Sequence, residues 1–304
     1  MKQMKNNVML LLTALIWGYA FVAQSVGMDY VGPFTFNCVR CILGSIILIP
    51  VIFLMDGLKK RSGMEEEAMK KARGNGRMLL TGGICCGVIL AVASSLQQFG
   101  ILFTTVGKAG FITAMYIVLV PILGVFVGKK IRPLIVLCVL VAVAGLYFLC
   151  MTEQFALGMG DLFVLLCALV FSIHILVIDH FSPLVDGVRM SAIQFLTAGI
   201  VCGVPMLIWE NPKPENILAA WMPVLYAGIL SCGVAYTLQI LGQKNVDPTV
   251  ASLLLSLESV FSVLAGWVIL HQSLNQRELF GCALMFAAII MAQLPQRKGQ
   301  GNKA

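Results

Sequence analysis

The sequence predicts an all-α integral membrane protein with ten transmembrane helices in two inverted five-helix repeats. Three observations lead to this fold class. Of the 304 residues, 59% are hydrophobic and only 12% are charged, about half the charged fraction of a soluble domain. Apolar runs of about 20 residues, the length that crosses a bilayer as a helix, recur from end to end. Segments of the first half also reappear, in the same order, in the second half.

Ten spans are predicted from the apolar runs that lie between charges and turn residues. Pro33, Pro133 and Pro248 stand where a helix would begin, a position that tolerates a missing N–H. The first run leads into the next without a small-residue cleavage site, so we interpret it as a membrane helix rather than a signal peptide. The spans are 8–27, 33–55, 78–100, 104–127, 131–150, 160–179, 189–208, 219–242, 248–270 and 277–294.

The distribution of basic residues predicts the orientation. With the N-terminus inside, 17 of the 21 Lys and Arg residues fall in cytoplasmic segments, seven of them between Lys59 and Arg77. Under the positive-inside rule, both termini and the charged loop 56–77 are cytoplasmic in an inner or plasma membrane. The net charge of +7 therefore reflects topology, and no nucleic-acid partner is expected. Arg40, one or two turns inside the second span, is interpreted as an anchor that reaches the headgroups.

Two pairs of segments indicate an internal repeat. Residues 96–130 match residues 238–272 without gaps at an offset of 142, and residues 14–24 match residues 168–178 at an offset of 154. The difference between the offsets is absorbed by the charged segment 56–77, which has no counterpart of its size in the second half.

The repeat divides the chain into residues 1–152 and residues 153–304, the second ending in a short cytoplasmic tail. Because each repeat has five crossings, the second enters the membrane from the opposite side. The offset of 142 also aligns Tyr116 with Glu258, each near the middle of its span. These two side chains are therefore expected at equivalent depths around a central cavity.

Glu258 is the only charged residue of its span. A carboxyl group at the bilayer centre costs about 2.5–3.5 kcal/mol to insert, so it faces the bundle interior or a wet cavity. Two interpretations stay open: a group that binds a substrate amine or couples protons to transport, and a structural hydrogen bond.

Further polar residues are candidates for a substrate pathway. Trp17 and Gln24 share one face of the first span, where either a cavity lining or interhelical hydrogen bonding explains them. His174 is either a proton relay or a buried histidine with a hydrogen-bond partner. Pro121 should kink the fourth span. The complete set of pathway candidates is Trp17, Gln24, Gln97, Gln98, Tyr116, His174, Tyr236, Gln239 and Glu258.

Several functional classes lack their motifs. The sequence contains no Walker-type glycine loop and no HExxH, GxSxG or clustered His/Asp set. We therefore expect neither an enzyme nor an ATP-driven pump, and no cofactor or metal ion.

Four segments carry a family resemblance: "LIWGYAFVAQ", "LQQFGILFTTVGKAGFITAMYIVLVPIL", "GDLFVLLCALVFSIHILVIDHFSP" and "PTVASLLLSLESVFSVLAGW". They are similar to the EamA-type ten-helix proteins of the drug/metabolite transporter superfamily. The chain departs at Ser259, where similar proteins often have proline after the acid.

The resemblance implies a helical bundle whose central cavity is lined by both halves and moves small organic molecules, often amino acids or related metabolites, with drugs as a further class. We accordingly expect a secondary transporter, working as an exporter by alternating access, whose partners are its small-molecule substrate and the lipid bilayer. The alternative is a membrane interaction or assembly protein that transports nothing. A monomer and a homodimer both stay open.

Overall fold

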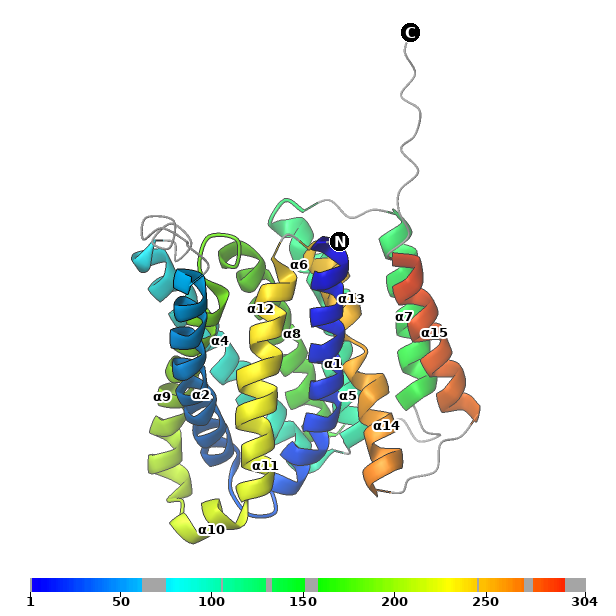
Figure 1. Cartoon of the computed structure of the whole chain (residues 1–304). Helices are drawn as coiled ribbons and strands as arrows, with labels where there is room; N and C mark the ends of the chain where they lie inside the picture. The colour runs from blue at the N-terminus through cyan, green and yellow to red at the C-terminus, as the bar shows by residue number, and fades with distance from the viewer. Residues whose placement is uncertain are drawn as a thin grey trace.

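The protein is a bundle of helices in the computed structural model (Figure 1). The structure describes residues 2–61, 75–104, 106–129, 133–150, 158–244, 246–270 and 276–292. Within these ranges every regular element is a helix, and no strand occurs. Lipid offers no hydrogen-bonding partner to backbone groups, so helices that satisfy their own N–H and C=O groups are the expected solution for so apolar a chain.

Helices follow one another through the described ranges. Those of the first half are α1 (Lys2–Gly27), α2 (Pro33–Arg61), α4 (Gly76–Phe103), α5 (Val106–Ala114), α6 (Tyr116–Phe126) and α7 (Pro133–Cys150). Those of the second half are α8 (Met159–Phe181), α9 (Gly187–Pro205), α10 (Pro214–Ala219), α11 (Trp221–Leu225), α12 (Thr237–Gln243), α13 (Pro248–Leu255), α14 (Glu258–Leu270) and α15 (Gln276–Ala292). The three prolines predicted at helix starts do begin α2, α7 and α13. Two π-helical segments complete the set, η1 (Met206–Glu210) after α9 and η2 (Tyr226–Tyr236) between α11 and α12.

Among the described residues, eight stretches are long and apolar enough to cross a membrane, and they fall on eight of the ten predicted spans. The other two predicted spans, 131–150 and 277–294, fall on α7 and α15, whose apolar stretches are shorter. The chain is therefore a multi-pass membrane protein. The eight stretches are Met4–Gly27, Pro33–Leu58, Gly76–Phe103, Ala109–Phe126, Met159–Phe181, Gly187–Glu210, Trp221–Gln243 and Pro248–Ile269.

Some of the predicted features lie outside the described residues. These are most of the loop 56–77, the first residues of the predicted span 131–150, the last residues of the predicted span 277–294, and the C-terminal tail.

Polar side chains are concentrated inside the bundle and large apolar ones on its outside. Phe53 and Trp209, for example, are 72% and 71% exposed. This arrangement suits lipid, where apolar groups meet the acyl chains and polar groups find partners only in the interior. Six glutamines are buried: Gln24, Gln97, Gln98, Gln194, Gln239 and Gln243.

Glycines allow close helix packing where α4 crosses α9. A Cβ atom at Gly83 would lie 2.5 Å from the side chain of Ile193, and one at Gly87 would lie 2.6 Å from the carbonyl oxygen of Gln194. Small residues at such crossings let helix backbones approach and gain van der Waals contact. The same helix α4 also packs against α8, so it joins the two halves of the chain.

Candidate functional site

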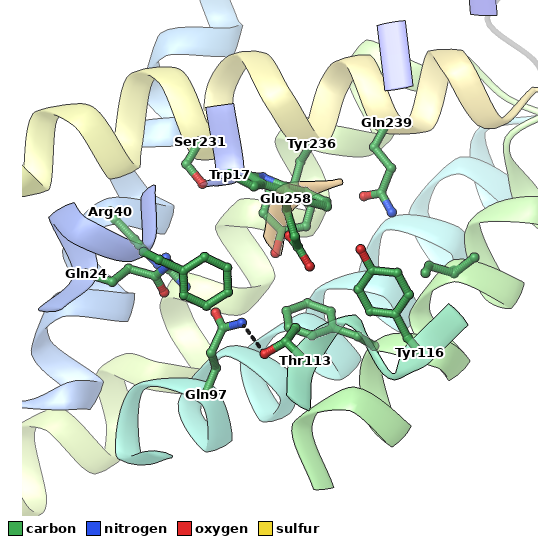
Figure 2. A pocket seen from close by; sticks show the side chains of 13 residues that line it. Trp17, Gln24, Arg40, Gln97, Thr113, Tyr116, Ser231, Tyr236, Gln239 and Glu258 are labelled. Atoms are coloured by element: carbon green, nitrogen blue, oxygen red, sulfur yellow. Dashed lines mark hydrogen bonds between the residues drawn. The ribbon is translucent and has the colours of Figure 1, made fainter. Parts of the chain in front are cut away.

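A cavity lies between helices of both halves of the chain (Figure 2). Seven of the nine predicted pathway residues line it: Trp17, Gln24, Gln97, Tyr116, Tyr236, Gln239 and Glu258. Six further residues that the sequence did not single out for a pathway complete the lining: Phe21, Arg40, Thr113, Phe171, Ile175 and Ser231. The lining thus combines aromatic rings, amides, hydroxyls, a guanidinium and a carboxyl group, as expected for a small polar ligand.

The cavity is small in this conformation. Its volume is about 30 Å³, space for about two water molecules. Sites for small organic molecules usually occupy roughly 300–1,000 Å³. The cavity in this conformation has no room for a metabolite-sized compound, which fits only after helices move apart.

Six of the lining side chains carry a buried polar atom without a hydrogen-bond partner in the described part of the chain. Leaving such an atom unpaired costs about 1–3 kcal/mol, so native proteins rarely accumulate several in one place. Their convergence on a single cavity indicates a site that water or a polar ligand completes. The atoms are Trp17 Nε1, Gln24 Oε1, Arg40 Nε, Tyr116 OH, Gln239 Oε1 and Glu258 Oε1.

Two interrupted helices bring Tyr116 and Glu258 to the cavity. The first is interrupted between α5 and α6, and Tyr116 is the first residue after the interruption. The second is interrupted between α13 and α14, where Glu258 is the first residue of α14. Both interruptions fall at the same place of the alignment with an offset of 142. The matching of these two residues, which rested on a weak sequence similarity, is thus also a matching of local structure.

The interruption before Glu258 forms without a proline. Here serine hydroxyls hydrogen-bond nearby backbone carbonyls. Ser256 Oγ donates to Leu253 O at 2.8 Å, and Ser259 Oγ donates to Ser256 O at 2.7 Å. Such side-chain bonds compete with the helical pattern and bend helices. The absence of proline at Ser259 therefore does not remove the break at this site.

The first interruption lies near Pro121, although not at it. The helical pattern is broken at Met115, and α6 then runs through Pro121. Proline has no N–H to offer to the carbonyl of Ile117, so the first turn and a half of α6 holds one backbone bond fewer. The predicted weakness of this span is present, but the break occurs before the proline.

A π-helical segment and an aromatic cluster form one wall. Segment η2 contributes Ser231 and Tyr236 to the cavity, and π-helices often occur at functional sites. The ring of Tyr236 lies 4.5 Å from that of Trp17, centroid to centroid, and 5.6 Å from that of Phe195. On the opposite side, Gln97 Nε2 donates to Thr113 Oγ1 at 3.3 Å (Figure 2).

Gln98 and His174 do not line the cavity, although they were predicted as pathway residues. Gln98 Nε2 donates to the backbone oxygen of Gln24 at 3.4 Å. His174 is fully buried, with its Nε2 3.0 Å from Gln194 Oε1. These contacts favour the alternative interpretation of His174 as a buried histidine with a hydrogen-bond partner.

Arg40 is the main residue that sequence reasoning assigned differently. It was interpreted as a headgroup anchor, but its side chain is only 3% exposed and lines the cavity. The available signal was a charged residue two turns inside an apolar span, which normally faces the bundle interior.

Comparisons with known proteins agree with a transporter fold over the full chain. The profile of the EamA-like transporter family matches residues 4–151 and again residues 158–293. An "uncharacterized transporter" of Archaeoglobus fulgidus is 29% identical over 294 residues, 96% of this chain and 87% of that protein. The "uncharacterized transporter YoaV" of Bacillus subtilis is 24% identical, over 91% of this chain and 92% of that protein. A solved crystal structure with 19% identity aligns with 95% of this chain and 96% of its own, at a TM-score of 0.74; that likeness shows a shared fold.

Proposed function

From its membership of the EamA-like transporter family, part of the drug/metabolite transporter superfamily, we propose that the chain is a secondary transporter of small organic metabolites. It would export amino acids or related compounds by alternating access. The family and the names of the relatives point to a transporter rather than an enzyme. The observation that carries the proposal is a closed cavity between the two halves, lined by polar groups that lack partners.

The proposed architecture has ten crossings in two inverted five-helix repeats, residues 1–152 and 153–304. Two separate matches to one family profile support this division. The pattern of helix contacts supports it as well. Helix α4 packs against α8. In the other half, the segments that correspond to α4 are η2 and α12, and both pack against α1, which corresponds to α8. Helix α1 likewise packs against α14, and α8 packs against α6.

Two further contacts pair helices with their own counterparts: α2 packs against α9, and α7 packs against α15. Contacts of both kinds are expected when two repeats are related by a two-fold axis. With five crossings each, such repeats have opposite orientations in the membrane, and the substrate site then lies at their interface.

Alternating access would use the segments of irregular backbone that line the cavity, where the helices can bend. The interrupted helices α5–α6 and α13–α14 and the π-helical segment η2 have irregular backbone beside the cavity. Interrupted membrane helices are typical of transport sites, where the freed backbone and side-chain groups bind substrate and coupling ions. Glu258, 4% exposed at the start of α14, is the proposed proton-coupling group.

We propose an orientation with both termini in the cytoplasm of a cell membrane, because 17 of 21 basic residues then lie on the cytoplasmic side. In Figure 1 the start of α1 and the short helix α10 lie at opposite ends of the bundle, so α10 would lie on the outer side.

Transport in proteoliposomes tests the proposal. The purified protein should move at least one member of a labelled amino-acid and metabolite panel, and Glu258→Gln should lower the rate at least about tenfold while the protein still folds. Glu215→Gln is the matched control, because Glu215 is an exposed residue of α10. Transport by Glu258→Gln at the normal rate under every proton gradient would exclude proton coupling through this residue, and the absence of all transport would favour the assembly-protein alternative.

A further inference from the structure

Arg40 places a positive charge inside the cavity. It lies on α2, seven residues after the helix start at Pro33, about 10 Å along the helix axis. Its guanidinium carbon is 5.6 Å from the ring centroid of Phe36, one turn earlier on the same helix. Phe36 is fully buried, so this cation–π contact holds the guanidinium at a fixed place in the interior.

Within the described part of the chain, this charge has no carboxylate partner. No carboxylate of the described residues lies within ion-pair distance of Arg40, and its Nε has no hydrogen-bond partner. A guanidinium cannot lose its proton in a protein, so Arg40 cannot become neutral as a buried lysine can. A buried unpaired charge is strongly destabilising, and the anion that compensates it must come from elsewhere during the transport cycle.

Glu258 lines the same cavity but at another point. Figure 2 shows Arg40, Gln24 and Ser231 toward one end, Glu258 in the middle, and Tyr116 and Gln239 toward the other end. The cavity therefore presents a fixed cation at one end, with amide and hydroxyl groups beside it, and an acid farther along. An opposite charge on the ligand fits each of these points.

We propose that Arg40 is a specificity-determining residue that binds the carboxylate of the transported compound. The inference rests on the proposed transport function and names its substrate class: an organic acid with a single carboxylate at the Arg40 end. Guanidinium and carboxylate form two parallel charge-assisted hydrogen bonds, and Gln24 and Ser231 can donate further ones. Among the described residues, Arg40 is the only cationic side chain of the lining, so one negative charge balances it, whereas a phosphate dianion would leave an excess.

Purified full-length protein can be tested by thermal denaturation with matched pairs of compounds. Each standard amino acid, lactate and succinate is compared with its own amide or methyl ester, and inorganic phosphate is included. A monocarboxylate that binds should raise the Tm by about 3 °C or more at saturation, while its amide, phosphate and the dianion succinate should not. Transport of the binding compounds is then measured in proteoliposomes.

Three variants assign the effect to Arg40. Arg40→Gln should abolish the acid-dependent rise in Tm and weaken the apparent affinity at least about tenfold. Arg40→Lys, which keeps the charge but not the fork of donors, should retain part of the rise. Arg277→Gln is the matched control: this arginine stacks 5.4 Å from the ring of Tyr147, away from the cavity lining. Should Arg40→Gln fail to fold, Arg40→Lys still tests the proposal through the loss of affinity.

The rival explanation is that Arg40 and Glu258 pair with each other in another conformation. In that case the double variant Arg40→Gln/Glu258→Gln, which removes both charges, should restore the stability lost in Arg40→Gln. Our proposal predicts instead an acid-dependent rise in Tm in the unmodified protein and no recovery of stability in the double variant relative to Arg40→Gln.

The outcomes separate the two proposals of transport and of anion binding. Equal Tm shifts by acids and their amides, or an unchanged acid preference in Arg40→Gln, would overturn the role of Arg40 while transport stands. Failure of every compound to bind and to cross the membrane would overturn the transport function itself.

Discussion

The two interrupted helices, α5–α6 and α13–α14, have equivalent positions in the two halves but different side chains. After the first break stands Tyr116, and α6 then contains Pro121. After the second break stands Glu258, and the flanking turns are held by serine hydroxyls that bind backbone carbonyls. The same backbone irregularity is thus formed by two different local chemistries.

The two breaks share their place in the chain and differ in the residue that follows them. A break in the helix occurs in both halves of the chain, so it does not depend on one residue type. The acid occurs only in the second copy, where its carboxyl oxygen Oε1 has no partner among the described residues. Functional asymmetry is therefore expected at the first residue after each break.

Removing each of these two groups should give the largest contrast. We expect Glu258→Gln to lower the transport rate at least about tenfold and Tyr116→Phe to lower it only about twofold to fourfold, because a carboxyl group can carry a charge that a phenol lacks. Initial rates in proteoliposomes measure both. Equal losses in the two variants would mean that the two breaks have equivalent roles.

A second contrast concerns the helix that packs on each break. A Cβ atom at Gly18 of α1 would lie 2.3 Å from Phe261 Cβ and 2.9 Å from the carbonyl oxygen of Glu258. The aligned residue in α8 is Ser172, which already has a side chain. Gly18→Ala should therefore push α14 away and cost about 1–3 kcal/mol, seen as a lower Tm together with slower transport.

Gly57→Ala is the control for that substitution, since a Cβ atom there meets nothing within 4 Å. A Gly18→Ala variant as stable and active as Gly57→Ala would show that α1 and α14 are not tightly packed at the second break.

Pro121 gives a third, smaller contrast. In Pro121→Ala the residue regains an N–H for the carbonyl of Ile117, so α6 becomes more regular beside the first break. We expect the Tm to rise slightly and the transport rate to fall about threefold, as when a moving segment is stiffened. Unchanged transport with a higher Tm would indicate that α6 does not bend during the cycle.

The smallest effect is expected for Ser259→Pro. Ser259 is the second residue of α14, and its N–H donates only to Ser256 O at 3.2 Å. Proline is tolerated in the first helical turn, so transport should stay within about twofold of the unmodified protein. Ala265→Pro, in the interior of α14, should by contrast lower the yield of folded protein, since it costs about 3 kcal/mol. Loss of folding in Ser259→Pro would refute the position of the break.

Much of the fold follows from the sequence because the bilayer imposes a length and a composition on each crossing. Eight predicted spans coincide with helices of sufficient length and apolarity. The π-helical form of η2 could not be predicted, since its apolar pattern is that of an ordinary membrane helix. The break before Glu258 was also unexpected without proline, because serine in a helix usually only bends it.

The candidate site was partly predictable from depth. Seven of the polar or aromatic residues singled out within apolar spans line the cavity. Depth does not fix direction, however: Gln97 and Gln98 are one residue apart, and successive residues point about 100° apart on a helix. Only Gln97 lines the cavity. Arg40 was assigned to the headgroups because a long side chain can extend outward or inward from the same backbone position.

Alternating access is tested by measuring the accessibility of the cavity from each face of the membrane. Gln24 and Gln239 lie toward opposite ends of the cavity (Figure 2), so each is replaced by cysteine in a transport-competent background without the ten native cysteines. An impermeant maleimide is then applied from either side. We predict that the cysteine at position 24 reacts from outside and that at position 239 from inside, with every condition that raises one reactivity lowering the other. Reaction of both from the same face, or reactivities that rise and fall together, would contradict alternating access to this cavity.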